Sequence, residues 1–201
     1  MKPRDGALGK FVLHTFLWLP VCFAAWYFSA PYHSAAIGEL ARILIDQVHY
    51  GTVTAIERAG VELVFVTSIK VQPTPGQSAL LLPQVNPLLY TFGLPFFLAL
   101  MLAARSSWWK ILLGAVLLLP FQSWGVGFDF LAQVGTKFGA DAAAQAELRG
   151  WRLEAVALSY QVGSLIFPTL IPVMLWAGFN RRFIEVVLRG RADTLAESGR
   201  R

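Results

Sequence analysis

Four long stretches of the chain contain almost no charge, and they constrain the fold more than any other feature. A helix needs roughly 20 apolar residues to cross the hydrocarbon core of a bilayer. Charged residues make up 14% of the chain, whereas soluble domains carry about a quarter, and the charges here lie between the apolar stretches. We therefore expect an α-helical integral membrane protein with four transmembrane helices, at residues 11–29, 87–104, 111–128 and 155–179.

The basic residues orient these four spans. If the N-terminus is cytoplasmic, eleven of the 17 lysines and arginines fall on the cytoplasmic side and six on the outer side. Cytoplasmic loops carry an excess of lysine and arginine, so we expect both termini in the cytoplasm and a basic cytoplasmic tail at 180–201. Basic residues that flank apolar segments do not form the continuous patch that nucleic-acid binding needs, and we expect no nucleic-acid partner.

The start of the chain resembles a signal peptide, with basic residues before an apolar run. That run is longer than the apolar region of a typical signal peptide, and proline follows Ser29 and Ala30 at the position where cleavage would occur. We interpret residues 11–29 as a retained membrane anchor.

The segment 30–86 is predicted to be an extracytoplasmic insertion made of one helix and a β-hairpin. Residues 34–48 place apolar side chains at helical spacing, so this helix is amphipathic and is expected to lie on the membrane or cover a sheet. Residues 52–57 and 61–71 read as two strands joined by a turn at 58–60. A lone two-stranded hairpin is marginally stable in water, so this one must pack on another structure. The apolar positions of the helix are Ile37, Leu40, Ala41, Leu44, Ile45 and Val48.

A second extracytoplasmic segment is predicted at 131–154. Its alanine-rich part, residues 140–147, favours a short helix. No internal repeat relates the first two spans to the last two, which argues against a repeat-built transporter.

Polar side chains within the spans gather in their middle and outer parts. Unpaired polar groups are costly in hydrocarbon, so they mark either helix contacts or function. Two interpretations stay open: these groups form hydrogen bonds between helices, or they face a cleft that contacts a partner. Catalysis is the least favoured, because no histidine or carboxylate pair is expected at this depth. The candidate residues are Asn86, Tyr90, Gln122, Trp124, Asp129, Tyr160 and Gln161.

Proline and glycine recur in these spans. Proline removes a hydrogen-bond donor and kinks a helix, and glycine lets two helices approach closely. Pro168 and Pro172 are four residues apart, so one face of the last span is perturbed twice. The glycines expected at close helix contacts are Gly93, Gly114, Gly125, Gly127 and Gly163.

The single cysteine, Cys22, lies within the first span. A catalytic cysteine needs an activating base and usually a nearby cation. His14 is eight residues earlier on the same helix, roughly 12 Å along its axis, so we interpret Cys22 as a packing residue. The three histidines lack the spacing of a metal site. We expect no catalytic residue, metal or other cofactor.

Four strings are more specific than composition: WLP at 18–20, NPLLYTFGLP at 86–95, LPFQSWGV at 119–126 and YQVGSL at 160–165. With the layout of the spans, they resemble the exosortase H-associated membrane proteins. This resemblance implies a bacterial inner-membrane accessory of an exosortase, a multi-span cysteine transpeptidase that processes proteins with a C-terminal sorting signal. No functional residue is carried over from it.

Three functions are consistent with these features. The leading hypothesis is a non-enzymatic partner of an exosortase or of its substrate, embedded in membrane lipid and acting at the outer face. The second is a membrane enzyme acting on a lipid-linked substrate, with Asp129 and Tyr160 or Glu154 as acid or base. The third is an assembly subunit of another envelope complex.

Overall fold

The computed structural model describes residues 5–74 and 77–185, and this part of the chain is mostly helical. Its helical elements are α1 (Asp5–Val48), α2 (Leu88–Thr91), α3 (Gly93–Ala103), α4 (Trp108–Thr136), α5 (Ala140–Gln145), α6 (Trp151–Gln161), the π-helical segment η1 (Val162–Ile166) and α7 (Phe167–Phe179). Its strands are β1 (Val53–Ala59), β2 (Glu62–Thr67), β3 (Lys70–Thr74), β4 (Gln77–Leu80) and β5 (Gln84–Val85). Residues 186–201, most of the predicted basic tail, lie outside the described residues.

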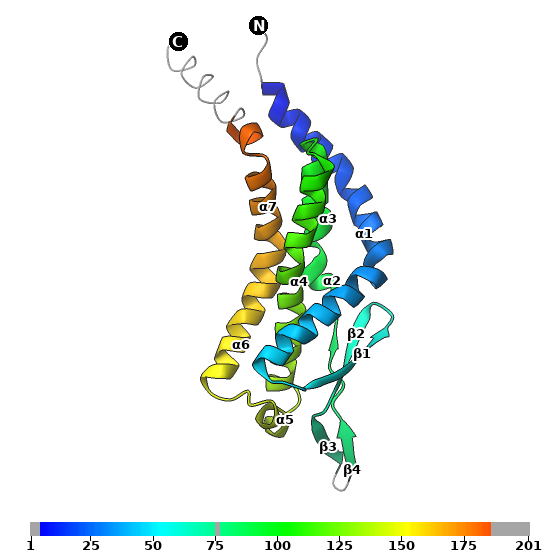
Figure 1. Ribbon diagram of the computed structural model, residues 1–201, viewed down its shortest axis with the longest axis vertical. Helices are drawn as coiled ribbons and strands as arrows, with labels where there is room; N and C mark the ends of the chain where they lie inside the picture. The colour runs from blue at the N-terminus through cyan, green and yellow to red at the C-terminus, as the bar shows by residue number, and fades with distance from the viewer. Residues whose placement is uncertain (1–4, 75–76, 186–201) are drawn as a thin grey trace.

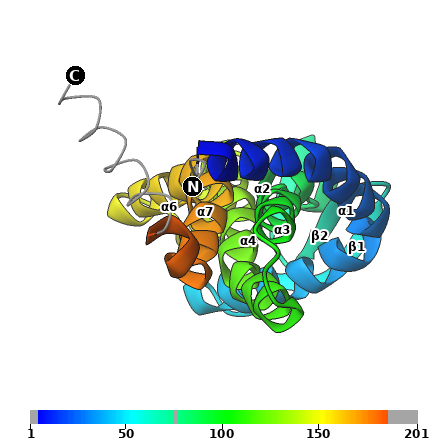
Figure 2. The same cartoon turned by 90° about the horizontal axis from the view of Figure 1, so that it is seen from above.

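Helix α4 is the centre of the molecule. It contacts α1 and α3 on one side and α6, η1 and α7 on the other (Figures 1 and 2). The strands gather at one end of the molecule. The start of α1 and the end of α7 lie at the opposite end (Figure 1). The described part of the chain therefore begins and ends at the same end of the molecule.

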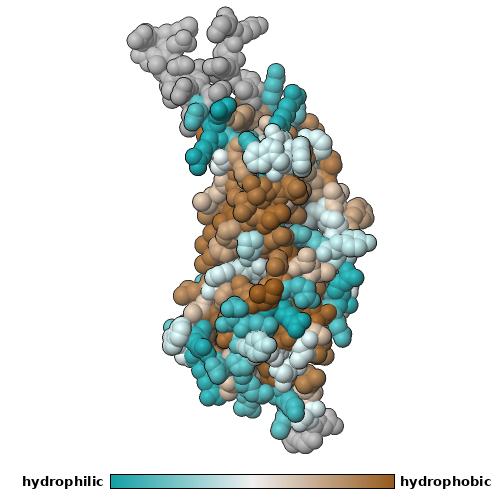
Figure 3. Space-filling model, in the orientation of Figure 1, coloured by the Kyte–Doolittle hydropathy of each residue, from teal (hydrophilic) through white to brown (hydrophobic). Residues whose placement is uncertain are grey.

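Three helical segments of the described chain are long and apolar enough to cross a membrane: Leu8–Val48, Trp108–Thr136 and Trp151–Phe179. The predicted second span becomes the shorter apolar helix Leu88–Ala103, which is below the roughly 20 residues that cross a full hydrocarbon core. Four crossings therefore remain a prediction. On the face shown in Figure 3, apolar side chains form a broad zone between the end that holds the strands and hydrophilic residues at the opposite end.

The first span and the amphipathic helix are one element, which corrects the prediction of two. Helix α1 runs through 44 residues and contains Pro20 and Pro31. Proline bends a helix without always ending it, since only the bond to one carbonyl is lost. Figure 1 shows the second half of α1 turning across the strands and α4. Its apolar face covers the sheet, and Ile37, Ala41 and Ile45 are fully buried there.

The predicted hairpin is present, but its loop is residues 60–61 and not the predicted 58–60. In the β1–β2 pair Ala59 lies opposite Glu62, so the loop is Gly60 and Val61, and Arg58 belongs to β1. Gly60 has a φ of +66°, and glycine first in a two-residue loop is typical of the type II′ turn that matches strand twist. The second predicted strand, 61–71, is divided between β2 and β3.

Two further strand pairs complete this end of the molecule. Strand β5 adds to β2, which gives a three-stranded antiparallel sheet in the order β1-β2-β5, and β3 pairs with β4 in a separate hairpin. The sheet is stabilised by its contact with the helices: the rings of Phe65 on β2 and Phe130 on α4 are 5.0 Å apart and both are fully buried.

Helix α4 extends to Thr136, beyond the predicted span that ends at residue 128. The start of the predicted second outer segment is thus helix. The short alanine-rich helix is confirmed as α5. Its Gln145 accepts a hydrogen bond from the Lys70 backbone N–H at 3.1 Å and donates one to the Lys70 carbonyl at 2.8 Å. The amide side chain therefore pairs with β3 as a neighbouring strand would.

The last predicted span is a bent helix. Pro168 has no N–H to bond the carbonyl four residues earlier, and the chain ahead of it widens into the π-helical segment η1, where the Phe167 N–H donates to the Val162 carbonyl. Such π-bulges occur as single turns within α-helices. The perturbation predicted at Pro168 is therefore present, whereas Pro172 lies within the regular helix α7.

All five predicted glycine contacts are present. A Cβ built on Gly93 would lie 2.5 Å from the Pro168 carbonyl oxygen, and one on Gly127 would lie 2.8 Å from Leu44 Cδ2. Gly114 faces the ring of Phe97 and Gly125 the ring of Tyr90. Gly163 lies against Gly125 itself. Four of the five lie on α4 or are packed against it, so small residues allow its neighbours to approach.

The end opposite the sheet is fastened by a few polar bonds. The Ser106 hydroxyl donates to Asn180 Oδ1 at 2.7 Å, and Lys110 Nζ donates to the Phe179 carbonyl at 3.0 Å. Lysine at a helix C-terminus satisfies a carbonyl that has no partner within the helix. These bonds join the α3–α4 loop and the first turn of α4 to the end of α7.

Candidate functional site

Tyr90, Asp129 and Tyr160 come from α2, α4 and α6 and meet in the half of the bundle nearest the sheet. The Tyr90 side chain is 3% exposed, and its phenol lies beside the Asp129 carboxylate and the Tyr160 phenol. The ring of Tyr90 reaches this position because Gly125 has no side chain to exclude it. Three separate helical elements thus bring a polar side chain to the same part of the bundle.

Gln133, one turn after Asp129, extends this cluster to the sheet. Its Nε2 donates to Asp129 Oδ1 at 3.1 Å and to the carbonyl of Gln84 in β5 at 2.9 Å. Gln133 was not among the residues predicted from the sequence, because it lies more than one helical turn beyond residue 128, where the predicted span ended. Its spacing of four from Asp129 was the available signal, since such residues share a helix face.

Gln122 and His33 form a second pair. Nε2 of His33, in the second half of α1, lies 2.9 Å from Oε1 of the buried Gln122 on α4. This corrects the expectation that no histidine lies at the depth of the polar candidates, because α1 stays helical through Pro31 and returns across α4. We call the residues that gather there the polar layer: Tyr90, Gln122, Trp124, Asp129 and Tyr160. The Gln122 Nε2 atom is buried without a partner.

The remaining candidates have local or peripheral positions. Trp124 Nε1 donates to the Ser159 carbonyl at 3.0 Å, which links α4 to α6. The Asn86 Oδ1 atom accepts from the Leu88 N–H at 3.0 Å, a local bond of the Asx-turn type just ahead of α2. The Gln161 side chain is exposed and stands apart from the cluster. The structure therefore groups Tyr90, Gln122, Trp124, Asp129 and Tyr160 around α4.

A small cavity of about 10 Å³ lies beside Gln122. Its walls include Tyr90, Gly93, Phe167 and Pro168, so it occupies the place where the π-helical turn moves the last span aside. This volume is near the minimum for one water molecule. It is too small for a substrate, and it does not open the polar layer into a binding cleft.

The chemistry available to these groups is limited. The His33 ring faces an amide, and the free thiol of Cys22 is buried in the first half of α1. Eleven residues of helix separate them, roughly 16 Å along the axis. Among the described residues, no group of three or more histidine, cysteine or acidic side chains is arranged to hold a metal ion. Tyr90 with Asp129 is the pair closest to an acid–base arrangement.

The comparison that identifies the family covers most of the chain. A family model described as exosortase H-associated membrane protein matches residues 5–183. The chain belongs to this family. The resemblance drawn from its sequence strings is thereby confirmed. The name of the exosortase H-associated family implies association with exosortase H, which is consistent with an accessory membrane protein. No curated protein and no solved structure matches the chain.

For this family member, the structure shows which features could meet a membrane or a protein. Large apolar side chains on α1, α4 and α7 remain exposed, among them Phe16, Leu117 and Met174. Trp108 and Trp151, at the two ends of the bundle, are each 75% exposed, and tryptophan favours the membrane–water interface. Most of the candidate polar residues, by contrast, are directed inward.

Proposed function

We propose that this chain is a non-enzymatic accessory of exosortase H in the bacterial inner membrane, with both termini cytoplasmic and the sheet on the outer side. The observation that carries this proposal is the family match over residues 5–183. The charge asymmetry of the sequence supports the orientation. The exposed apolar side chains on α1, α4 and α7 support burial among lipids and membrane partners.

The polar layer is proposed to hold the bundle together. In support, the bonds of Gln122 to His33 and of Trp124 to Ser159 join α4 to α1 and α6. Asp129 accepts from Gln133 on the same helix, and Gln133 also bonds to β5. Groups used in this way are not free to meet a partner. The surface proposed to meet the exosortase or its exported substrate is instead the outer end, formed by the three-stranded sheet and the β3–β4 hairpin.

Gene deletion tests this proposal directly. Removing the gene should reduce processing of exosortase H substrates while exosortase H itself remains present in the membrane, and restoring the wild-type chain should restore processing. Normal processing in the deletion strain would contradict an accessory role. A defect in an unrelated envelope complex, with substrate processing intact, would favour the assembly-subunit alternative.

The second candidate function is an enzyme acting on a lipid-linked substrate. The observation that favours it is the position of the Tyr90 phenol beside the Asp129 carboxylate and the Tyr160 phenol. Asp129→Asn separates the two functions, because the amide keeps the shape of the side chain and cannot act as a general base. The accessory proposal expects Asp129→Asn to complement the deletion at normal protein level. Loss of complementation at normal level would favour the enzyme.

A further inference from the structure

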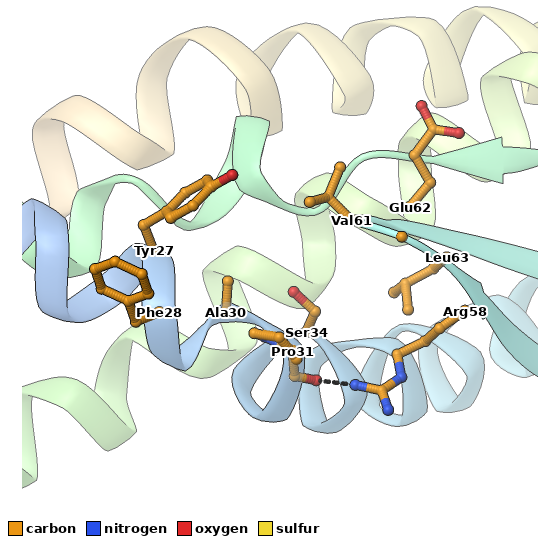
Figure 4. Close-up of a pocket in the computed structure, with 10 residues that line it drawn as sticks. Tyr27, Phe28, Ala30, Pro31, Ser34, Arg58, Val61, Glu62 and Leu63 are labelled. Carbon is orange, nitrogen blue, oxygen red and sulfur yellow. Dashed lines mark hydrogen bonds between the residues drawn. The ribbon is translucent and has the colours of Figure 1, made fainter.

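A cavity of about 240 Å³ lies between α1 and the turn of the β1–β2 hairpin. Figure 4 shows it at the bend of α1, with Tyr27 and Phe28 before the bend and Pro31 and Ser34 after it. Val61 and Leu63 close the opposite side. The cavity lies apart from the polar layer around α4 and shares no lining residue with the small cavity beside Gln122.

The polar groups of this cavity favour an anion. Arg58, at the end of β1, is held in place by a hydrogen bond from Nη1 to the Pro31 carbonyl at 2.9 Å. A guanidinium has five N–H donors in a planar fork that fits phosphate oxygens, so this bond leaves several available. Within the described residues, no carboxylate forms an ion pair with Arg58. The Glu62 carboxylate points away from it (Figure 4).

Ser34 adds a second donor. It is 5% exposed, and its hydroxyl is directed into the cavity (Figure 4). Burying a hydroxyl costs free energy unless a ligand, a water molecule or another polar group bonds to it. Arg58 and Ser34 together therefore offer a charged and a neutral donor to one occupant.

The walls of the cavity continue into the surface that faces lipid. Tyr27 is 56% exposed and Phe28 79% exposed, and on the same helix Val21 and Leu17 are also exposed. Aromatic rings of this kind favour the boundary between headgroups and acyl chains. If a lipid placed its anionic group at Arg58, its acyl chains would lie against the exposed apolar side chains of α1. A soluble peptide would leave these rings uncovered.

We propose that this cavity binds a membrane glycerophospholipid, with Arg58 and Ser34 donating hydrogen bonds to its phosphodiester and Tyr27 and Phe28 contacting its acyl chains. The bound lipid would fill the space between the bend of α1 and the hairpin and so fix the sheet relative to the membrane. This proposal goes beyond the accessory function and does not depend on the identity of the partner.

Lipid titration followed by native mass spectrometry tests the proposal on the purified full chain. Phosphatidylglycerol and phosphatidylethanolamine should bind, and diacylglycerol with the same acyl chains should not. Arg58→Gln should weaken phospholipid binding by about tenfold, the cost of about 1.4 kcal/mol. Arg149→Gln, which removes the same charge from an exposed position elsewhere, should leave binding unchanged. Equal affinity of the two variants would overturn the proposal, as would tight binding of diacylglycerol.

Three further measurements test whether the cavity binds free phosphate or a peptide instead of a phospholipid. Val61→Trp should fill the cavity and exclude the phospholipid without changing charge, and it provides an independent test if Arg58→Gln unfolds. Inorganic phosphate at millimolar concentration should not displace the lipid; displacement would show a site for free phosphate. A photoreactive benzophenone side chain in place of Val61 should form a covalent adduct with a phospholipid in cells. An adduct with a protein would overturn the proposal and show that the cavity binds a peptide.

Discussion

The Nε2 atom of His33 lies 2.9 Å from the Oε1 atom of Gln122, and this contact joins the second half of α1 to the middle of α4. The Gln122 amide is only partly hydrogen-bonded, because its Nε2 atom is buried without a partner. His33→Ala would leave both polar atoms of the amide unpaired. We expect it to lower the free energy of unfolding by about 1–3 kcal/mol.

Replacing both partners should cost less than replacing one. In the double variant His33→Leu with Gln122→Leu, no buried polar atom of this pair remains, and such replacements can be nearly neutral. Thermal unfolding in detergent of the wild type, His33→Leu, Gln122→Leu and the double variant measures the coupling energy between the two residues. Additive effects of the two substitutions would show that the contact does not form.

The close approach of α3 and α7 predicts a strong effect at Gly93. A Cβ at this position would lie 2.5 Å from the Pro168 carbonyl oxygen, and backbone cannot move aside as easily as a side chain. We expect Gly93→Ala to destabilise the chain by about 1–3 kcal/mol.

Gly178→Ala is the matched control for this substitution. No atom lies within 4 Å of a Cβ built there, and alanine favours helix over glycine, so stability should stay equal or rise. Denaturation in detergent compares the two variants. If Gly93→Ala is as stable as Gly178→Ala, the α3–α7 packing described here is wrong.

The pairing of Gln145 with Lys70 predicts local rather than global instability. Gln145→Ala removes both hydrogen bonds between α5 and β3. We expect the Lys70 amide to exchange with solvent about fivefold faster, which corresponds to about 1 kcal/mol for the lost bonds. Hydrogen exchange followed by mass spectrometry measures this, and Gln161→Ala, an exposed glutamine outside the cluster, should leave exchange at Lys70 unchanged. Unaltered exchange in Gln145→Ala would contradict the contact.

The proposed topology predicts which positions a membrane-impermeant maleimide reaches. With Cys22 replaced by alanine, single cysteines at Tyr50 and Arg149 should be labelled from outside, and those at Ser107 and Arg181 should not. These four positions are exposed on the surface of the chain. Ser107 is decisive for the short helix Leu88–Ala103. Labelling of Ser107 together with Tyr50 would show that this helix does not cross.

Periodicity in the sequence was sufficient to predict much of the local structure. The apolar positions Ile37, Ala41 and Ile45 are fully buried beneath the predicted helix, because a 3.6-residue repeat fixes which face of a helix is apolar. The five glycines at close contacts were also predictable, since a missing side chain in a membrane helix has few other uses. Both are properties of a single residue or a single element.

Properties that depend on where two distant segments meet were not predictable. Whether Pro31 ends α1 or bends it depends on what the following residues pack against, and this decides the position of His33. Strand β5 consists of two residues, too few for a pattern, and pairs with β2 because the chain returns there before α2. Gln145 lies in an alanine-rich segment whose sequence gives no sign of the strand it contacts.

Co-purification tests the central claim, association with exosortase H, most directly. The tagged chain should be expressed from its own locus and purified in mild detergent after confirmation that it supports substrate processing. We predict that exosortase H is enriched in the purified material, relative to another multi-span inner-membrane protein of similar abundance. Two results together would contradict the association: exosortase H is absent from the purified material, and its substrates are processed normally in a strain that lacks the chain.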